Sequence, residues 1–345
     1  MPEALLQTMS KPLPVHCSRV SSAWTWRDRL GAIKVRWGIG RMRYAVRPGL
    51  YSVGSPKPEA PVFVTANYKL SFDHLRRALR GLDGWILVLD TKAVNVWCAA
   101  GKGTFSTAEV VQRIREVQLD QVVSHRQLIL PQLSAPGVNA FEVTRLSGFH
   151  VVYGPVYARD LPGFLAAGNT ASPEMRRVHF RWHERLAVAP LELVIHFKRM
   201  LLAGLALALL SGLSPAGFSF TQAAARGGPV LLLWLAVYVL AGLLGPLLLP
   251  WLPARAFAIK GAWLGAALAA MSMLVIPSAW TMLRLTAWLI LVIAGASFLL
   301  LNFTGATTFT SPSGVRREVR VALPAQAALG ILGLAAWTLA GWNSL

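Results

Sequence analysis

Short apolar runs separated by mixed segments fill the first half of this chain, whereas long apolar runs fill the second half. Val62–Ala66 and Trp85–Leu89 are continuous apolar runs of strand length, which is typical of strands covered on both faces. Further strands are predicted at 128–130 and 149–152, and helices at 72–82, capped by Ser71, and at 106–117, capped by Ser106. This alternation predicts a mainly parallel, Rossmann-like α/β domain over residues 61–165.

Five apolar stretches in the second half are long enough to span a bilayer, and they predict an all-α transmembrane domain over residues 195–345. They cover residues 195–213, 230–249, 257–276, 282–301 and 321–340. A juxtamembrane linker helix is predicted over 166–194. Within it, His179 and His183 would share one helix face, yet no third metal ligand is evident nearby.

Basic residues flank the predicted spans unevenly, which predicts their orientation. One side receives Lys198, Arg199, Arg255, Lys260, Arg316, Arg317 and Arg320, and the other only Arg226 and Arg284. Residues 1–20 lack the pattern of a secretory signal. We therefore expect a multi-pass protein of the cytoplasmic membrane, with the α/β domain in the cytoplasm and the carboxyl end outside.

Composition agrees with a membrane protein, because 54% of the residues are hydrophobic and only 14% are charged. The net charge of +19 raises the question of nucleic acid. No aromatic-basic motif or nucleic-acid fold accompanies that charge, so we expect contact with anionic lipid and no nucleic-acid binding. The two cysteines, Cys17 and Cys98, cannot hold an iron–sulfur cluster by themselves, since a cluster takes four thiolates.

The basic and aromatic lead-in, residues 1–60, has two interpretations. Tryptophans alternate with arginines from Trp24 to Arg47. This segment is either an amphipathic stretch lying on the membrane or on the α/β domain, or a docking patch for an acidic partner such as a ferredoxin.

The segment after the strand at 85–89 holds the best candidate for chemistry. A short helix is predicted from Ala93 to Ala100, ending at Gly101, with Cys98 in its middle. A helix at the carboxyl end of a parallel strand lies where open α/β sheets bind ligands. Glycines on both sides of Lys102 permit close approach of a flat ligand. From the residues alone, Cys98 is either a soft-metal or redox ligand, or an inert buried thiol.

The stretch Asn95–Lys102, NVWCAAGK, resembles the cap-helix signature of the mercury-methylating corrinoid proteins, relatives of the corrinoid iron–sulfur protein of the acetyl-CoA pathway. Arg47–Tyr51 and Val64–Asp73 are similar to other stretches of that family, and so is the order of a soluble domain followed by a membrane domain. The resemblance implies a corrinoid-dependent methyltransferase that passes a methyl group from methyl-Co(III) to Hg(II), giving methylmercury.

The resemblance also implies the roles of individual residues. Cys98 would be the lower axial ligand of the cobalt of a base-off cobalamin, through its thiolate. The remaining cofactor contacts would be Asn95, Val96, Trp97, Ala99, Ala100, Gly101 and Lys102 of the cap helix, with Thr65, Ala66 and Asn67 at the end of the first strand. The hydroxyl-rich loop 302–314 resembles one in this family and is expected to contact the corrinoid domain or its partner.

The implied partners are a ferredoxin-like electron donor with 4Fe–4S clusters and a methyl donor of the methyl-tetrahydrofolate pathway of anaerobes. Two alternatives stay open. One is a membrane-bound corrinoid methyl carrier of one-carbon metabolism that does not act on mercury. The other is a non-catalytic, membrane-anchored α/β module in which Cys98 is inert.

Overall fold

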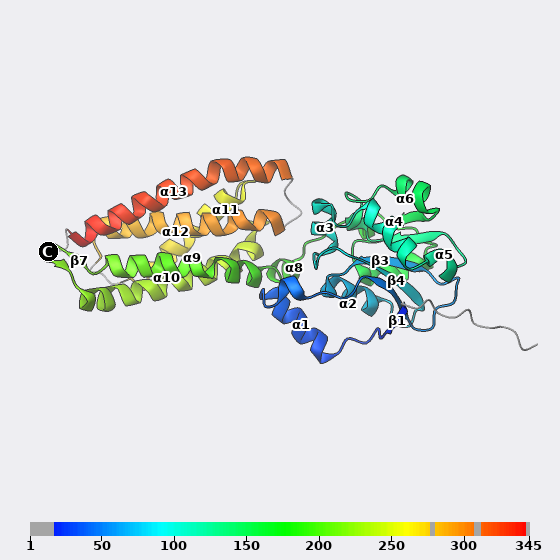
Figure 1. Ribbon diagram of the computed structural model, residues 1–345. Helices are drawn as coiled ribbons and strands as arrows, with labels where there is room; N and C mark the ends of the chain where they lie inside the picture. Colours follow the sequence, from blue (N-terminus) through cyan, green and yellow to red (C-terminus); the bar gives the residue numbers. More distant parts are fainter. Residues whose placement is uncertain (1–16, 277–279, 307–311, 343–345) are drawn as a thin grey trace, which may run out of the picture. The chain divides into compact units, whose positions relative to one another are not determined.

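The computed structural model describes residues 17–276, 280–306 and 312–342, which form two compact units (Figure 1). Unit 1 comprises the described residues up to Val35 together with Ile39–Val178. Unit 2 comprises Arg36–Gly38 and the described residues from His179 onward. Each unit has a hydrophobic core of its own, so each is described by itself.

Unit 1 is built on a six-stranded sheet with the strand order β1-β2-β4-β3-β5-β6. The strands are β1 (Cys17–Val20), β2 (Gly49–Val53), β3 (Val62–Ala66), β4 (Gly84–Leu89), β5 (Gln127–Leu130) and β6 (His150–Tyr153). β4, β3, β5 and β6 pair in parallel, β2 is antiparallel to β4, and β1 is parallel to β2. The predicted α/β class and the parallel sheet are confirmed.

The order of the parallel strands defines where loops diverge. The chain runs from β3 to β4 on one side, then crosses over β3 to β5 and continues outward to β6. Loops that follow β3 and β5 therefore leave in opposite directions at the carboxyl edge of the sheet. In open α/β sheets this switch point is where ligands bind.

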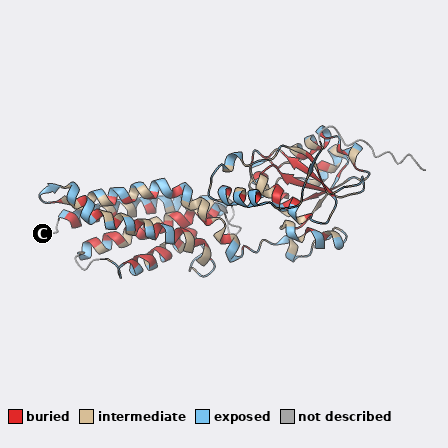
Figure 2. Ribbon diagram, turned by 90° about the horizontal axis from the view of Figure 1, so that it is seen from below, coloured by how far each residue is buried: buried red, intermediate tan, exposed pale blue. Residues whose placement is uncertain are grey.

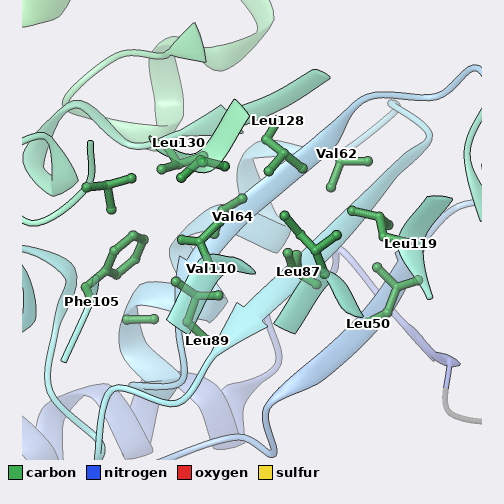
Figure 3. Packing of buried hydrophobic residues seen from close by; sticks show 14 of the residues in the cluster. Leu50, Val62, Val64, Leu87, Leu89, Phe105, Val110, Leu119, Leu128 and Leu130 are labelled. Carbon is green, nitrogen blue, oxygen red and sulfur yellow. The ribbon is translucent and has the colours of Figure 1, made fainter. Parts of the chain in front are cut away.

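Helices cover both faces of the sheet because its strands carry apolar side chains on both sides. Alternate residues of β3, β4 and β5 pack into two clusters, one of which is shown in Figure 3 with Val64, Leu87 and Leu130 among its members. That cluster also holds residues of α3 (Val96–Lys102), α4 (Thr107–Glu116), α5 (Leu119–Val122) and α6 (Ala140–Ser147). The opposite cluster includes residues of α2 (Lys69–Ala78) and α7 (Leu161–Ala166). Figure 2 shows the strands as the buried centre of this unit.

Several predicted boundaries shift in the structure. The strand at 62–66 is confirmed residue for residue, but β1 and β2 join the sheet ahead of Pro61, where the sequence predicted the domain to begin. α2 starts at Lys69, and Ser71 is not its cap, because the Tyr44 carbonyl accepts a hydrogen bond from the Lys69 N–H. Unit 1 also contains short 3-10 turns at Arg41–Arg43, Gln132–Ser134 (η2), Ala158–Asp160 and Glu174–Arg176.

A buried ion cluster fastens the amino-terminal helix α1 (Trp26–Arg36) to α2. Asp28 of α1 pairs with Lys69 at 2.9 Å and with Arg76 at 2.8 Å, and both cations also pair with Asp73. Burial would raise the pKa of the Asp28 carboxyl, but hydrogen bonds from Lys69, Thr25 and Arg76 outweigh it and hold that pKa well below its usual range. The folded state is thus stabilised by ionised Asp28.

This depressed pKa predicts acid sensitivity of unit 1. The stabilisation by Asp28 is fully present above about pH 4, the ordinary titration range of aspartate, and is lost as the pH falls further toward the folded-state pKa. Asp28→Asn should lower stability at pH 7 by about 1–3 kcal/mol and flatten the loss of stability below about pH 4. Pulse proteolysis of the full chain in urea measures both. An unchanged pH profile in Asp28→Asn would contradict the assignment.

Unit 2 is helical apart from a two-stranded ribbon, β7 (Leu213–Ser214) and β8 (Gly217–Phe218), within its described residues. Its helices are α8 (Trp182–Leu186), α9 (Ala189–Leu210), α10 (Phe220–Leu248), α11 (Phe257–Ser272), α12 (Met282–Asn302) and α13 (Pro312–Trp342), with a 3-10 turn at Phe303–Ala306. α9, α10, α12 and α13 lie side by side in Figure 1, and the contacts agree. α11 packs closely on α12 because a Cβ at Gly261 or Gly265 would clash with the α12 backbone.

Four helical stretches among the described residues are long and apolar enough to cross a membrane: Trp182–Leu210, Phe220–Leu248, Met282–Gly305 and Ser313–Trp342. Each of these contains or overlaps one predicted span. The remaining predicted span, 257–276, corresponds to α11, which is apolar but has only 16 residues. The predicted linker helix over 166–194 is instead split, because α9 already starts at Ala189 and only the short α8 precedes it.

Candidate functional site

The predicted cysteine helix is present as α3, shifted toward the carboxyl end. The sequence placed its start at Ala93, but Lys92 and Ala93 have positive φ angles of 57° and 58° and form a turn. Asn95 is the N-cap, and its Oδ1 accepts a hydrogen bond from the Cys98 N–H at 2.9 Å. The helix continues through Gly101 to Lys102, and Gly103, whose φ of 76° favours glycine, is its C-cap.

Asn67 holds the turn that leads into α3. It follows β3 directly and its side chain is buried. Its Oδ1 accepts hydrogen bonds from the Thr91 N–H at 3.2 Å, the Thr91 hydroxyl at 2.9 Å and the Ala93 N–H at 3.0 Å. Its Nδ2 donates to Asp90 at 3.3 Å. One amide side chain therefore fixes a left-handed turn that would otherwise be strained.

A second layer of charged groups supports the same turn. Glu109 of α4 accepts a hydrogen bond from the Asp90 N–H at 2.8 Å and pairs with Arg113 at 2.7 Å. The pKa of the Asp90 carboxyl is held below its usual value. Burial alone would raise that pKa, but hydrogen bonds from Lys92 outweigh the effect of burial. Ser106 caps α4 as predicted, by accepting a hydrogen bond from the Glu109 N–H, while the Glu109 side chain accepts from the Asp90 backbone.

α3 lies at the carboxyl edge of the sheet, at the switch point. It contacts the end of β3 and the η2 turn that follows β5, although it is connected in sequence to β4. Ala99 and Ala100 form its inner face and are buried. The backbone at Gly137 packs closely against this inner face, since a Cβ built on Gly137 would lie only 2.9 Å from the Ala100 Cα. The helix thus caps the strand ends closely.

The outer face of α3 is open. Trp97 is 36% exposed, and both Gly101 and Lys102 are exposed. A Cβ built on Gly101 would meet nothing within 4 Å. Cys98 lies half-buried between the inner and outer faces, and it is a free thiol, as is Cys17 of β1. The structure therefore presents one thiol beside a surface that is open at Gly101.

The donor set near Cys98 suits a ligand that brings its own metal. Among the described residues, no group of three or more His, Cys, Asp or Glu side chains could hold a bare metal ion. His179 precedes α8 while His183 lies within it, so the predicted shared helix face is absent. A single half-buried thiol next to the open Gly101 surface fits a flat metal-containing cofactor that needs one axial ligand from the protein.

The structure brings the predicted site residues together unevenly. Asn95, the N-cap of α3, and Val96 and Cys98 within α3 are half-buried. Thr65 and Ala66 are buried at the end of β3. The sequence analysis did not include Asp90, Thr91 and Glu109 in the site, although they position the turn that leads into α3. The Asp-Thr pair directly after an apolar strand is the sequence feature that could have indicated this turn. Residues 307–311 of the predicted contact loop 302–314 lie outside the described residues.

Comparison with known proteins places this site in a family context. Residues 39–165 match the family described as CO dehydrogenase/acetyl-CoA synthase delta subunit. That segment contains β2 to β6 and α3, and therefore the whole site. The matches support the predicted kinship with the corrinoid iron–sulfur protein, and they name neither mercury nor a membrane.

Individual relatives are similar over the same part of the chain. The gamma subunit of the acetyl-CoA decarbonylase/synthase complex of Archaeoglobus fulgidus is 34% identical over 122 residues, which are 35% of this chain and 26% of that protein. The gamma subunit from Methanocaldococcus jannaschii is 38% identical over 99 residues, 28% of this chain and 20% of its own length. The corrinoid/iron-sulfur protein large subunit of Moorella thermoacetica is 27% identical over 129 residues, 37% of this chain and 28% of its own. The chain thus spans about a quarter of the length of these curated relatives.

Proposed function

We propose that this chain is a corrinoid-binding methyl carrier of one-carbon metabolism, anchored in a membrane by unit 2. The observation that carries the proposal is the half-buried Cys98 thiol on α3, at the switch point of the sheet and beside an open surface. This arrangement lies within the segment shared with subunits of the acetyl-CoA decarbonylase/synthase complex and with a corrinoid/iron-sulfur protein.

Each residue of the site has a role in this proposal. A bound corrinoid supplies a cobalt centre that accepts and releases a methyl group. Cys98 would hold the corrinoid through a soft, electron-donating thiolate. Asn95 fixes the first turn of α3 and Asn67 fixes the turn before it, so both orient the thiol. Trp97, Gly101 and Lys102 are exposed and would offer the outer surface of α3 to the macrocycle.

Reduction of the cofactor needs a partner, because the two cysteines cannot form a four-thiolate cluster. A ferredoxin-like protein with 4Fe–4S clusters is the proposed electron donor, and the methyl-tetrahydrofolate pathway the proposed methyl source. The four apolar helical stretches and the distribution of basic residues favour the cytoplasmic membrane, with unit 1 on the cytoplasmic side. A carboxyl end outside, as expected from five spans, requires α11 to cross the membrane as well.

A second candidate function is methylation of Hg(II) as the acceptor of the methyl group. The observation that favours it is the NVWCAAGK stretch with its Trp97–Cys98 pair, which resembles the mercury-methylating corrinoid proteins. The Cys98 thiolate would donate electron density to a bound methyl-corrinoid, which would supply a methyl group able to leave with its bonding electrons, and Hg(II) is an electrophile suited to accept such a group.

A methyl-acceptor assay tests the function and separates the two candidates. The full chain in detergent, loaded with methylated cobalamin carrying a labelled methyl group, is offered Hg(II) or a one-carbon acceptor such as reduced tetrahydrofolate. Transfer of the label to either acceptor supports a methyl carrier, and the preferred acceptor decides its class. Label that stays on the protein with both acceptors would refute methyl transfer to Hg(II) and to the one-carbon acceptor, and a protein that retains no label would leave only a non-catalytic module.

A further inference from the structure

The helix α1 carries large apolar side chains on its outward face, which is unusual for a surface helix of a soluble domain. Trp26 is 65% exposed, Leu30 42% and Ile33 53%. At about 100° per residue these three positions fall on one side of the helix. The residues that pack onto unit 1, Asp28, Ala32 and Val35, fall on the opposite side and are buried.

Cations border this apolar stripe on both sides. By the same helical spacing, Arg27 and Lys34 flank the stripe on one side, and Arg29 and Arg36 on the other. Asp28 is the only acidic residue between Ser21 and Lys57, and it is buried against Lys69 and Arg76. The outward surface of α1 is therefore an apolar stripe between two basic rows, without an exposed acid.

The ion cluster also fixes α1 in place. Arg76 adds hydrogen bonds at 2.7 Å to the carbonyls of Ser21 and Ala23, just ahead of α1. Together with the Asp28 pairs, these bonds hold the stripe outward instead of letting it turn into the core. After the end of α1, the side chains of Ile39, Met42 and Arg43 are exposed as well.

We propose that α1 is an interfacial helix that lies on the surface of an anionic bilayer. A central apolar stripe containing tryptophan, with long basic side chains at both borders, matches the acyl region and the anionic headgroups of a lipid surface. An acidic protein partner would meet the cations but leave the stripe against water, and a second copy would bring like charges together. The inference rests on the proposed membrane insertion of unit 2, which keeps unit 1 close to lipid.

Site-directed spin labels in the full chain test this surface. Labels are attached at Leu30→Cys or Ile33→Cys in a background with Cys17→Ser and Cys98→Ser. Phe141→Cys of α6, where Phe141 is 75% exposed, serves as the aqueous control of unit 1, and Leu332→Cys of α13, 60% exposed, reports insertion of unit 2. The protein is reconstituted in vesicles of phosphatidylcholine alone or with phosphatidylserine, and the accessibility of each label to oxygen and to a water-soluble nickel complex is compared.

We expect the labels on α1 to favour oxygen over nickel in the anionic vesicles, and to shift toward nickel in the neutral vesicles or when Arg27, Arg29 and Lys34 are replaced by glutamine. Leu332→Cys should favour oxygen in both, and Phe141→Cys should favour nickel in both. Labels on α1 that favour nickel while Leu332→Cys favours oxygen would overturn the inference alone. Protection of α1 only by an added ferredoxin, or spin–spin broadening between copies, would overturn it too. Nickel access at Leu332→Cys would overturn membrane insertion and this inference with it.

Discussion

Replacing Cys98 by alanine is expected to lower methyl transfer by the full chain at least about 100-fold, since loss of groups that merely support a metal ligand already costs 10- to 100-fold. The reason is local. No other thiol of the described residues lies on α3, and no cluster of metal-binding side chains could replace the ligand. The measurement is the initial rate of label transfer from methylated cobalamin to the acceptor identified for the wild type.

Cys17→Ala is the matched control for this experiment, because it removes the second free cysteine of the chain. Cys17 lies in β1 at the far end of the strand order, where burial raises the pKa of its thiol despite a hydrogen bond with Ser52. We expect a transfer rate within about twofold of the wild type. If Cys98→Ala kept the wild-type rate, the ligand assignment would be refuted.

Asn67→Ala is expected to destabilise unit 1 by about 2–4 kcal/mol and to weaken corrinoid binding at least about 10-fold. The substitution leaves the N–H groups of Thr91 and Ala93 without their acceptor and frees the left-handed turn before α3. Asn67 thus acts through the placement of Cys98. Urea midpoints by pulse proteolysis and cobalamin titration of the full chain give the two values.

Gln112→Ala is the control for Asn67→Ala. It removes an exposed side-chain hydrogen bond to Glu116 on α4, and both quantities should change little. Because a positioning residue affects the ligand and not the chemistry itself, Asn67→Ala saturated with cobalamin should regain most of the transfer rate. A rate that stays low at saturation would show that Asn67 contacts the reacting groups.

The sequence predicts those elements whose pattern is local. The runs at 62–66 and 85–89 are apolar throughout because parallel strands are covered on both faces, and both strands are present. β1 and β2 were not predicted because they lie in a segment rich in arginine, and they are strands only through the pairing of β1 with β2 and of β2 with β4. The transmembrane pattern is likewise local, although α11 proves shorter than a span.

The details of the site depend on contacts that are distant in sequence. The start of α3 was placed too early because the turn at Lys92 and Ala93 is held by Asn67, which lies 26 residues before Ala93. The start of α2 was placed too late because its first N–H is satisfied by Tyr44. Cys98 itself could be singled out, since a cysteine helix directly after a buried strand falls at the carboxyl edge of the sheet.

The most direct test of the central claim is the absorption and electron paramagnetic resonance spectrum of the full chain after addition of cobalamin and removal of the excess. We expect the wild type and Cys17→Ala to retain one cobalamin with a base-off spectrum typical of thiolate ligation, and Cys98→Ala to lose that signature. Failure of the wild type to retain cobalamin, or an identical spectrum in Cys98→Ala, would contradict the account and return Cys98 to an inert thiol.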